Sequence, residues 1–182
     1  MMTIFVDTRE KPSHAYTFTS IGKSFVEFDV VRQKLDTGDY MTVRNGHCPQ
    51  DVEACAIVER KSLSDLYQTL TQGRDRFNRE LQRMEEYGYR AIVIESQWVE
   101  IINPNRFLPH PTKASPRSIV SSLLAWSQRH AVHIFPCPGA MAAEKFTFRI
   151  LERWYRDGNK KCGDQNVQGT FSKRPGSRTS DS

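Results

Sequence analysis

The most informative run of the sequence is Ala56-Ile57-Val58-Glu59-Arg60-Lys61-Ser62-Leu63-Ser64-Asp65. Its apolar start predicts a buried strand, and the charged triplet that follows predicts the end of that strand. Alternate residues of a strand point to the same face, so Glu59 and Lys61 project together. Ser62, with Asp65 three residues later, has the pattern of a helix N-cap, so we expect a helix to follow at once.

The flanking sequence alternates between strand-like and helix-like patterns. Strands are predicted at residues 3–7, 25–31, 38–43, 54–61, 91–95 and 133–136, and helices from 62, over 74–87, from 115 and over 140–155. The Asn45-Gly46 turn signal and a polar connection over 46–53 predict a hairpin that makes strands 38–43 and 54–61 neighbours. This alternation is typical of an α/β fold.

Length and composition favour one globular domain. The chain has 182 residues, of which 38% are hydrophobic and 10% aromatic, enough for one core. No apolar run approaches the roughly 20 residues that span a bilayer, and the N-terminus lacks a signal-peptide pattern. We therefore expect no membrane partner and a location in the cytoplasm, or in the nucleus of a eukaryote. The four cysteines are scattered without a Cys-x-x-Cys pair, which favours free thiols over a zinc site.

The composition changes at Arg156. We predict a folded domain over residues 1–155 and a basic, disordered tail over 156–182, in which six Lys or Arg stand against three Asp. The net charge of the chain is +5 and its pI is near 9.1, values that suit a polyanionic partner such as DNA. Many proteins of similar pI bind no nucleic acid, so charge alone assigns no function.

The residue types at the end of the 54–61 strand suit phosphodiester cleavage. The Glu59 carboxylate can hold Mg²⁺, which prefers oxygen ligands, and the Lys61 ammonium can orient the attacking water or offset charge on the phosphate. Asp39, which follows Gly38 on the neighbouring predicted strand, supplies a second carboxylate within reach of Glu59. The same spacing also occurs in solvated ion pairs at strand ends, so these residues alone leave a structural interpretation open.

A longer match surrounds these residues. Gly38-Asp39, nineteen intervening residues, Glu59-Arg60-Lys61, three further residues and Asp65 follow one another in that order. This pattern resembles the signature of the XPF family of structure-specific DNA endonucleases, which includes the archaeal Hef nuclease. The run Asp7-Thr8-Arg9-Glu10 after the first strand resembles the opening of the same nuclease domain, and the likeness covers roughly residues 3–155.

The resemblance implies a restriction-endonuclease-like fold, with a central mixed β-sheet flanked by α-helices. It implies that Mg²⁺ or Mn²⁺ is held by the carboxylates of Asp39 and Glu59 and by the backbone carbonyl of Arg60. Lys61 matches the catalytic lysine, and Asp7 and Asp65 match positions that support the site. A helix cap explains Asp65 equally well. The expected catalytic set is Asp7, Asp39, Glu59, Arg60, Lys61 and Asp65.

Arginines near this set are the expected DNA contacts. Arg9 matches a family position beside the site, and the predicted helix over 74–87 carries further arginines. The expected DNA-binding residues are Arg9, Arg74, Arg76, Arg79 and Arg83, and the basic tail is expected to add phosphate contacts. The family usually has Gln where this chain has Glu80, which is either an outer-sphere metal ligand or a surface partner of Arg76.

Together these features predict a compact, metal-dependent DNA endonuclease that needs no small-molecule cofactor. The resemblance implies cleavage of branched, flap or junction DNA in repair or recombination, and a homodimer formed through the final helices of the nuclease domain. The 27 residues after Tyr155 are too few and too polar for the tandem helix-hairpin-helix modules that members usually carry. Two alternatives stay open: a catalytically silent DNA-binding or scaffold subunit, and a sequence-specific restriction-type nuclease on the same fold.

Overall fold

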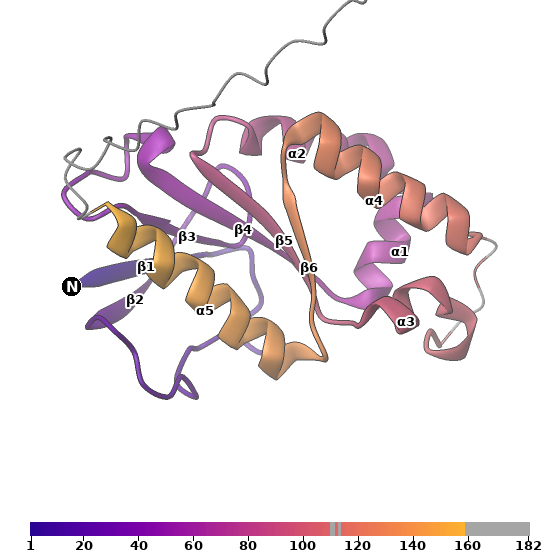
Figure 1. Ribbon diagram of the computed structural model, residues 1–182, viewed down its shortest axis with the longest axis horizontal. Coiled ribbons are helices and arrows are strands. Elements are labelled where there is room, and N and C mark those ends of the chain that lie inside the picture. The colour runs from indigo at the N-terminus through magenta and orange to yellow at the C-terminus, as the bar shows by residue number, and fades with distance from the viewer. Residues whose placement is uncertain (110–111, 113, 159–182) are drawn as a thin grey trace, which may run out of the picture.

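A six-stranded mixed β-sheet forms the centre of the protein, seen in a computed structural model that describes residues 1–109, 112 and 114–158 (Figure 1). The strands are β1 (Met2–Asp7), β2 (Phe28–Gln33), β3 (Tyr40–Val43), β4 (Cys55–Lys61), β5 (Tyr89–Ile94) and β6 (His133–Pro136). Their order across the sheet is β2-β1-β3-β4-β5-β6. β3 runs antiparallel to both β1 and β4, and the other neighbours are parallel. The predicted hairpin between the third and fourth strands is confirmed.

Helices cover both faces of this sheet. They are α1 (Leu63–Thr71), α2 (Arg74–Met84), α3 (Trp98–Ile102), α4 (Pro116–His130) and α5 (Ala140–Asp157), with short 3-10 helices η1 (Val52–Ala54) and η2 (Pro104–Arg106). α5 crosses one face, whereas α1, α2 and α4 gather on the other (Figure 1). Each face has its own hydrophobic core, so the fold has three layers, as the predicted α/β class requires.

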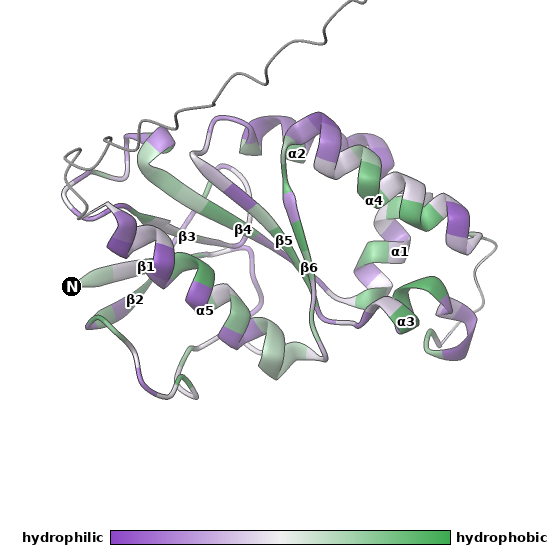
Figure 2. Cartoon of the chain, viewed as in Figure 1, coloured by the Kyte–Doolittle hydropathy of each residue, from purple (hydrophilic) through white to green (hydrophobic). Residues whose placement is uncertain are grey.

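Strand β4 contributes to both cores. Ile57 packs in the core beneath α1, α2 and α4, whereas Ala56 and Val58 pack in the core beneath α5. Figure 2 shows β4 hydrophobic along most of its length and hydrophilic at its C-terminal end. Burial of the apolar part holds the strand within the sheet, so the charged residues at its end have a fixed position.

The second strand begins later than predicted. Residues 25–31 alternate in polarity, but β2 covers Phe28–Gln33, because Glu152 of α5 binds the segment before it. The Glu152 carboxylate accepts hydrogen bonds from the Ser24 hydroxyl at 2.8 Å and from the Phe25 amide at 2.6 Å. This contact joins residues far apart in the chain and therefore has no local sequence signal.

Other boundaries differ by a few residues. The helix predicted over 74–87 ends at Met84, and the polar connection over 46–53 leads into the 3-10 helix η1. Helix α3 was not predicted, although Gln97 and Glu100 form a capping box at its start. α5 continues to Asp157, two residues past the predicted end of the domain, and the predicted tail beyond residue 158 lies outside the described residues.

Cys48, Cys55 and Cys137 are free thiols, as expected, and Cys162 lies outside the described residues. In the described part of the chain, no helix has both the length and the apolar character needed to cross a bilayer.

Candidate active site

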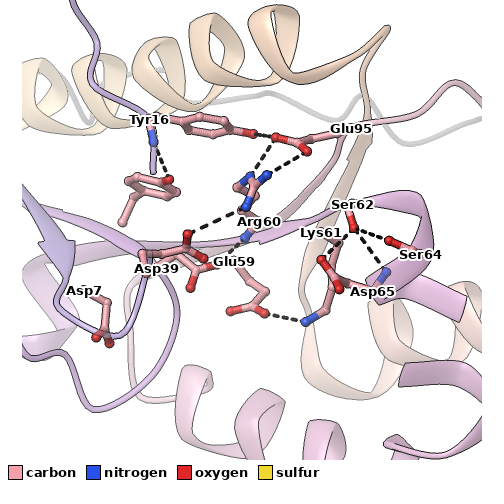
Figure 3. Close-up of polar contacts among 12 residues, drawn as sticks. Asp7, Tyr16, Asp39, Glu59, Arg60, Lys61, Ser62, Ser64, Asp65 and Glu95 are labelled. Atoms are coloured by element: carbon pink, nitrogen blue, oxygen red, sulfur yellow. Dashed lines mark hydrogen bonds and ion pairs between the residues drawn. The ribbon is translucent and has the colours of Figure 1, made fainter. Parts of the chain in front are cut away.

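The charged end of β4 extends past one of its two neighbours. β3 pairs with β4 only as far as Val58, whereas β5 follows β4 to Lys61. The last three residues of β4 therefore have an open edge on the side of β3. Asp39 comes directly before β3 and lies at this edge (Figure 3).

Three hydrogen bonds fix Asp39 at the open edge. Its amide donates to the Val58 carbonyl at 2.9 Å, and its carbonyl accepts from the Asp7 amide at 2.9 Å. Its carboxylate Oδ2 accepts from the backbone amide of Arg60 at 2.7 Å. This last bond satisfies a strand N–H that the β3 ladder no longer reaches, and it holds the carboxylate against the end of β4.

Gly38 permits this close approach of the chain to β4. Its φ is +67°, in the left-handed region that favours glycine. A Cβ atom there would lie 2.5 Å from Cγ1 of Ile57 and 3.3 Å from the carbonyl oxygen of Val58. The Gly-Asp pair of the sequence pattern thus has two physical causes: the backbone conformation at residue 38 and the carboxylate at residue 39.

Glu59 and Lys61 form a buried ion pair on one face of β4. Lys61 Nζ donates to Glu59 Oε1 at 2.6 Å. Lys61 is 9% exposed and Glu59 is 5% exposed. Lys61 Nζ also lies 4.3 Å from the centre of the Phe77 ring of α2. Burial disfavours the ammonium, but the charge and hydrogen bond of Glu59, together with the charges of Glu80 and Asp39, prevail and raise the pKa of Lys61. The structure therefore places both side chains on one face, as the strand periodicity predicted.

Negative charge accumulates where Asp39 and Glu59 meet. Burial, followed by the charge of Glu59, raises the pKa of Asp39 well above its usual range. Glu59 Oε2 is buried and has no hydrogen-bond partner among the described residues. A buried carboxylate oxygen without a partner is unfavourable, and a cation beside it would supply the missing interaction.

The donor atoms at this edge suit a hard divalent cation. The N–H and C=O groups of one strand residue point to the same neighbour, so the carbonyl of Arg60 faces the same open edge as its amide. The edge therefore offers two carboxylates and one carbonyl, all oxygen donors that suit Mg²⁺ or Mn²⁺. Across the described ranges, no group of three or more His, Cys, Asp or Glu side chains has an arrangement that could hold a metal ion. Water would have to complete the coordination.

Asp7 lies beside this edge, but its carboxylate is occupied by Arg9. Asp7 is 1% exposed and accepts from the Arg9 amide at 2.7 Å and from Arg9 Nε at 2.9 Å. The guanidinium also donates to the Leu35 carbonyl at 2.9 Å. Burial acts to raise the pKa of Asp7, but the bonds from Arg9 prevail and lower it. These contacts make Asp7 a support for Arg9 and, through its amide, for Asp39.

Asp65 is exposed in the first turn of α1. The Ser62 hydroxyl accepts from the Asp65 amide at 3.2 Å and donates to Asp65 Oδ2 at 2.6 Å. The helix start predicted at Ser62 is therefore confirmed. The contacts of Asp65 are those of a helix cap, which is the second interpretation that the sequence offered for this residue.

The Arg60 side chain points to the opposite face of the sheet. Its guanidinium donates to both carboxylate oxygens of Glu95, at 2.7 and 3.0 Å, and Tyr16 Oη donates to the same carboxylate at 2.8 Å (Figure 3). Arg60 thus offers its backbone to the site and uses its side chain to anchor β4. Sequence reasoning missed Glu95 and Tyr16, although Glu95 follows an apolar strand much as Glu59 ends one.

The arginines of α2 lie on the molecular surface. Arg76, Arg79 and Arg83 are exposed, and their role as phosphate contacts stays a prediction. Arg74 is also exposed, but its Nη2 donates to the Ser122 hydroxyl of α4 at 2.9 Å, so it also joins the two helices.

Glu80 differs from its arginine neighbours on α2. The residue is half-buried, and its pKa is raised by burial and next by the charge of Glu59. Lys61, Arg83 and Arg9 act in the opposite direction. These surroundings favour the interpretation in which Glu80 faces the site over the one in which it pairs with Arg76.

Comparisons with known proteins identify a family and similar folds. The family model described as the ERCC4 domain matches residues 6–150. XPF from Aeropyrum pernix is similar in structure, with a TM-score of 0.54 and 22% identity over 87% of this chain and 66% of that chain. XPF from Aeropyrum pernix in a complex with DNA gives a TM-score of 0.57 and 23% identity over 88% and 66%. No curated protein matches the chain. The similar structures confirm the predicted restriction-endonuclease-like fold, and this chain spans 66% of their length.

Substitution of Gly38 by alanine should destabilise the protein more than the same change at Gly46. Both glycines have positive φ, but a Cβ at residue 38 would collide with Ile57, whereas nothing lies within 4 Å at residue 46. We expect Gly38→Ala to lower the free energy of unfolding by about 2–4 kcal/mol and Gly46→Ala by about 1 kcal/mol. Urea denaturation measures both, and equal losses would contradict the role given to Gly38.

Removal of the Asp39 charge should stabilise the protein when divalent cations are chelated. The pKa of Asp39 in the folded protein is raised above its usual 3.8, so the folded state binds the proton more tightly than the unfolded state. The stability that this proton contributes is full below pH 3.8 and is lost as pH rises through the folded-state pKa. One proton changes the free energy of unfolding by at most about 1.4 kcal/mol per pH unit. Asn at this position keeps an acceptor for the Arg60 amide.

Denaturation of the wild type and of Asp39→Asn in EDTA, across the acid to neutral range, measures this difference. The variant should become the more stable protein as pH rises. A variant that is less stable than the wild type at neutral pH would show that the Asp39 carboxylate is not held in an unfavourable acidic environment.

Proposed function

The chain belongs to the ERCC4 domain family, and on that basis we propose that it is a metal-dependent endonuclease that hydrolyses phosphodiester bonds of DNA. The observation that carries the proposal is the open end of β4, where the carboxylates of Asp39 and Glu59 adjoin the Lys61 ammonium. A similar solved structure, that of XPF from Aeropyrum pernix, is a complex with DNA, which supports the choice of substrate.

The carboxylates of Asp39 and Glu59 and the backbone carbonyl of Arg60 would hold the cation of this reaction, Mg²⁺ or Mn²⁺. A bound divalent cation lowers the pKa of a coordinated water and offsets the charge that develops on the phosphate. The orphaned Oε2 of Glu59 supports this placement, because it needs a positive partner. The amide of Arg60 keeps Asp39 oriented, since it donates to Oδ2 of the Asp39 carboxylate.

Lys61 acts on the phosphate side of the site as a charged hydrogen-bond donor. Its ion pair with Glu59 and its contact with the Phe77 ring hold the ammonium in place. From there it orients the attacking water or stabilises negative charge on the scissile phosphate. Asp7 acts through Arg9: it holds the Arg9 side chain, which is 56% exposed, at a place on the surface that a DNA phosphate can reach.

The DNA path follows the exposed cations around this edge. A polar cavity of about 540 Å³ adjoins the start of α1 and is lined in part by Arg9, Lys11 and His14. The exposed arginines Arg76, Arg79 and Arg83 extend the basic surface along α2, and Arg74 adds to it. Binding through phosphates should weaken as salt concentration rises. The family likeness supports branched, flap or junction DNA as the substrate. It also supports a role in DNA repair or recombination.

Cleavage assays with labelled linear, flap and four-way DNA test the proposal, with Mg²⁺, with Mn²⁺ and with EDTA. Asp39→Asn and Lys61→Met should each lower the rate by about 100-fold or more, because each removes a group that acts on the reacting atoms. Asp36→Asn and Lys145→Met are matched controls, since both residues are exposed and lie outside the site. They should cut at the wild-type rate.

The outcomes separate the proposal from its alternatives. DNA binding without cleavage under any metal would leave only the scaffold function. Cleavage of linear DNA at one fixed sequence would favour a restriction-type nuclease. Full activity in both site variants would show that the reaction takes place elsewhere on the protein.

We also propose a homodimer formed through α5 and the neighbouring edge strand β6. A groove of about 400 Å³ lies there, lined by the apolar residues Phe135, Phe146 and Trp154 among others. Phe146 is 41% exposed and Met141 is 67% exposed, so this surface leaves apolar area in water that a second copy would cover.

Phe146→Glu should therefore shift the protein to a monomer in sedimentation equilibrium. Val99→Glu is the matched control, because Val99 is an equally apolar exposed residue on α3, 54% exposed. A wild type that stays monomeric at tens of micromolar, or a dimer that survives Phe146→Glu, would contradict this interface.

A further inference from the structure

Helix α2 directs a third carboxylate toward the end of β4. Phe77 of α2 lies under the Lys61 ammonium, with its ring centre 4.3 Å from Nζ. Residues three apart share a helix face, so Glu80 lies on the same side one turn later. The Thr37 hydroxyl donates to the Glu80 carbonyl at 3.2 Å, which ties this turn of α2 to the loop that leads into Gly38 and Asp39. This part of α2 therefore adjoins both the end of β4 and the segment that leads into Asp39.

The charges around Glu80 leave an excess of acid. Glu59 on β4 disfavours its negative charge, while Lys61 on β4, Arg83 on α2 and Arg9 after β1 favour it. Lys61 is already paired with Glu59, and Arg9 with Asp7, so neither is free to neutralise a further carboxylate. A half-buried acid close to the Glu59 carboxylate is costly unless a cation joins them.

Direct coordination by Glu80 does not fit the structure. Among the described residues, no group of three or more His, Cys, Asp or Glu side chains could hold a metal ion, so Asp39, Glu59 and Glu80 do not form a three-carboxylate site. Mg²⁺ and similar cations keep several waters when proteins bind them through one or two carboxylates. Such waters donate hydrogen bonds outward, and a nearby carboxylate is a strong acceptor for them.

We propose that Glu80 is a positioning residue that accepts hydrogen bonds from the water shell of the divalent cation held by Asp39 and Glu59. This inference rests on the proposed function, because it requires the cation site at the end of β4. Glu80 would then raise the affinity of the site for the cation and orient the waters around it. Groups in this outer position typically change metal affinity or activity by 10- to 100-fold.

Titration of the full chain with Mn²⁺, followed by the electron paramagnetic resonance signal of the free ion, measures this effect without any reaction. Glu80→Gln keeps the size of the side chain and should weaken Mn²⁺ binding by about 10-fold. Asp75→Asn is the matched control: it removes the same charge from the same helix, but Asp75 is exposed in the first turn. Its Mn²⁺ affinity should stay within about 2-fold of the wild type. Asp39→Asn serves as the variant that removes a ligand.

Thermal unfolding in EDTA distinguishes this role from a structural one. Without a cation, Glu80→Gln should raise the melting temperature, because the variant removes a like charge from the acidic cluster. A lowered melting temperature of Glu80→Gln in EDTA would overturn the role of Glu80. So would a Mn²⁺ affinity of Glu80→Gln equal to that of the wild type while Asp39→Asn binds poorly, and both results would leave the cation site intact. Unchanged affinity in Asp39→Asn as well would overturn the cation site itself, and the inference with it.

Discussion

The hydrogen bond from the backbone amide of Arg60 to the Asp39 carboxylate joins two strands at the point where their ladder ends. It replaces a missing partner in the sheet with a charged side chain, so the backbone is satisfied and a carboxylate is fixed beside Glu59. Gly38 allows the approach, because its left-handed conformation and missing side chain leave room for Ile57. The acidic character of the site follows from this junction of β3 and β4.

Because successive side chains of β4 point to opposite faces of the sheet, the residues of the proposed site and the residue that anchors the strand lie on different faces. Glu59 and Lys61 face the layer of α1 and α2, whereas the Arg60 side chain crosses to the other face and forms a fork with Glu95. Buried ion pairs add little net stability, but they give a strand end one defined position. A site that relies on two carboxylates and an ammonium needs such rigidity, because small displacements weaken catalysis strongly.

Sequence reasoning succeeded where the cause is local. The apolar run of β4, the Ser62 cap and the hairpin that places Asp39 beside Glu59 all have short-range signals, and the structure shows each of them. It failed where the cause is distant. The start of β2 depends on Glu152 of α5, and the partner of Arg60 comes from β5. Asp7 and Arg9 are only two residues apart in the sequence, but only the folded structure shows that the Arg9 guanidinium occupies the Asp7 carboxylate.

The proposed function depends on a divalent cation bound between Asp39 and Glu59 at the open end of β4. Anomalous diffraction from a crystal soaked in Mn²⁺ locates such an ion directly. We expect a peak beside both carboxylates and the carbonyl of Arg60, at oxygen distances of about 2.0–2.3 Å. A fully soaked crystal with no peak there, or with its strongest peak at another group of residues, would contradict the claim.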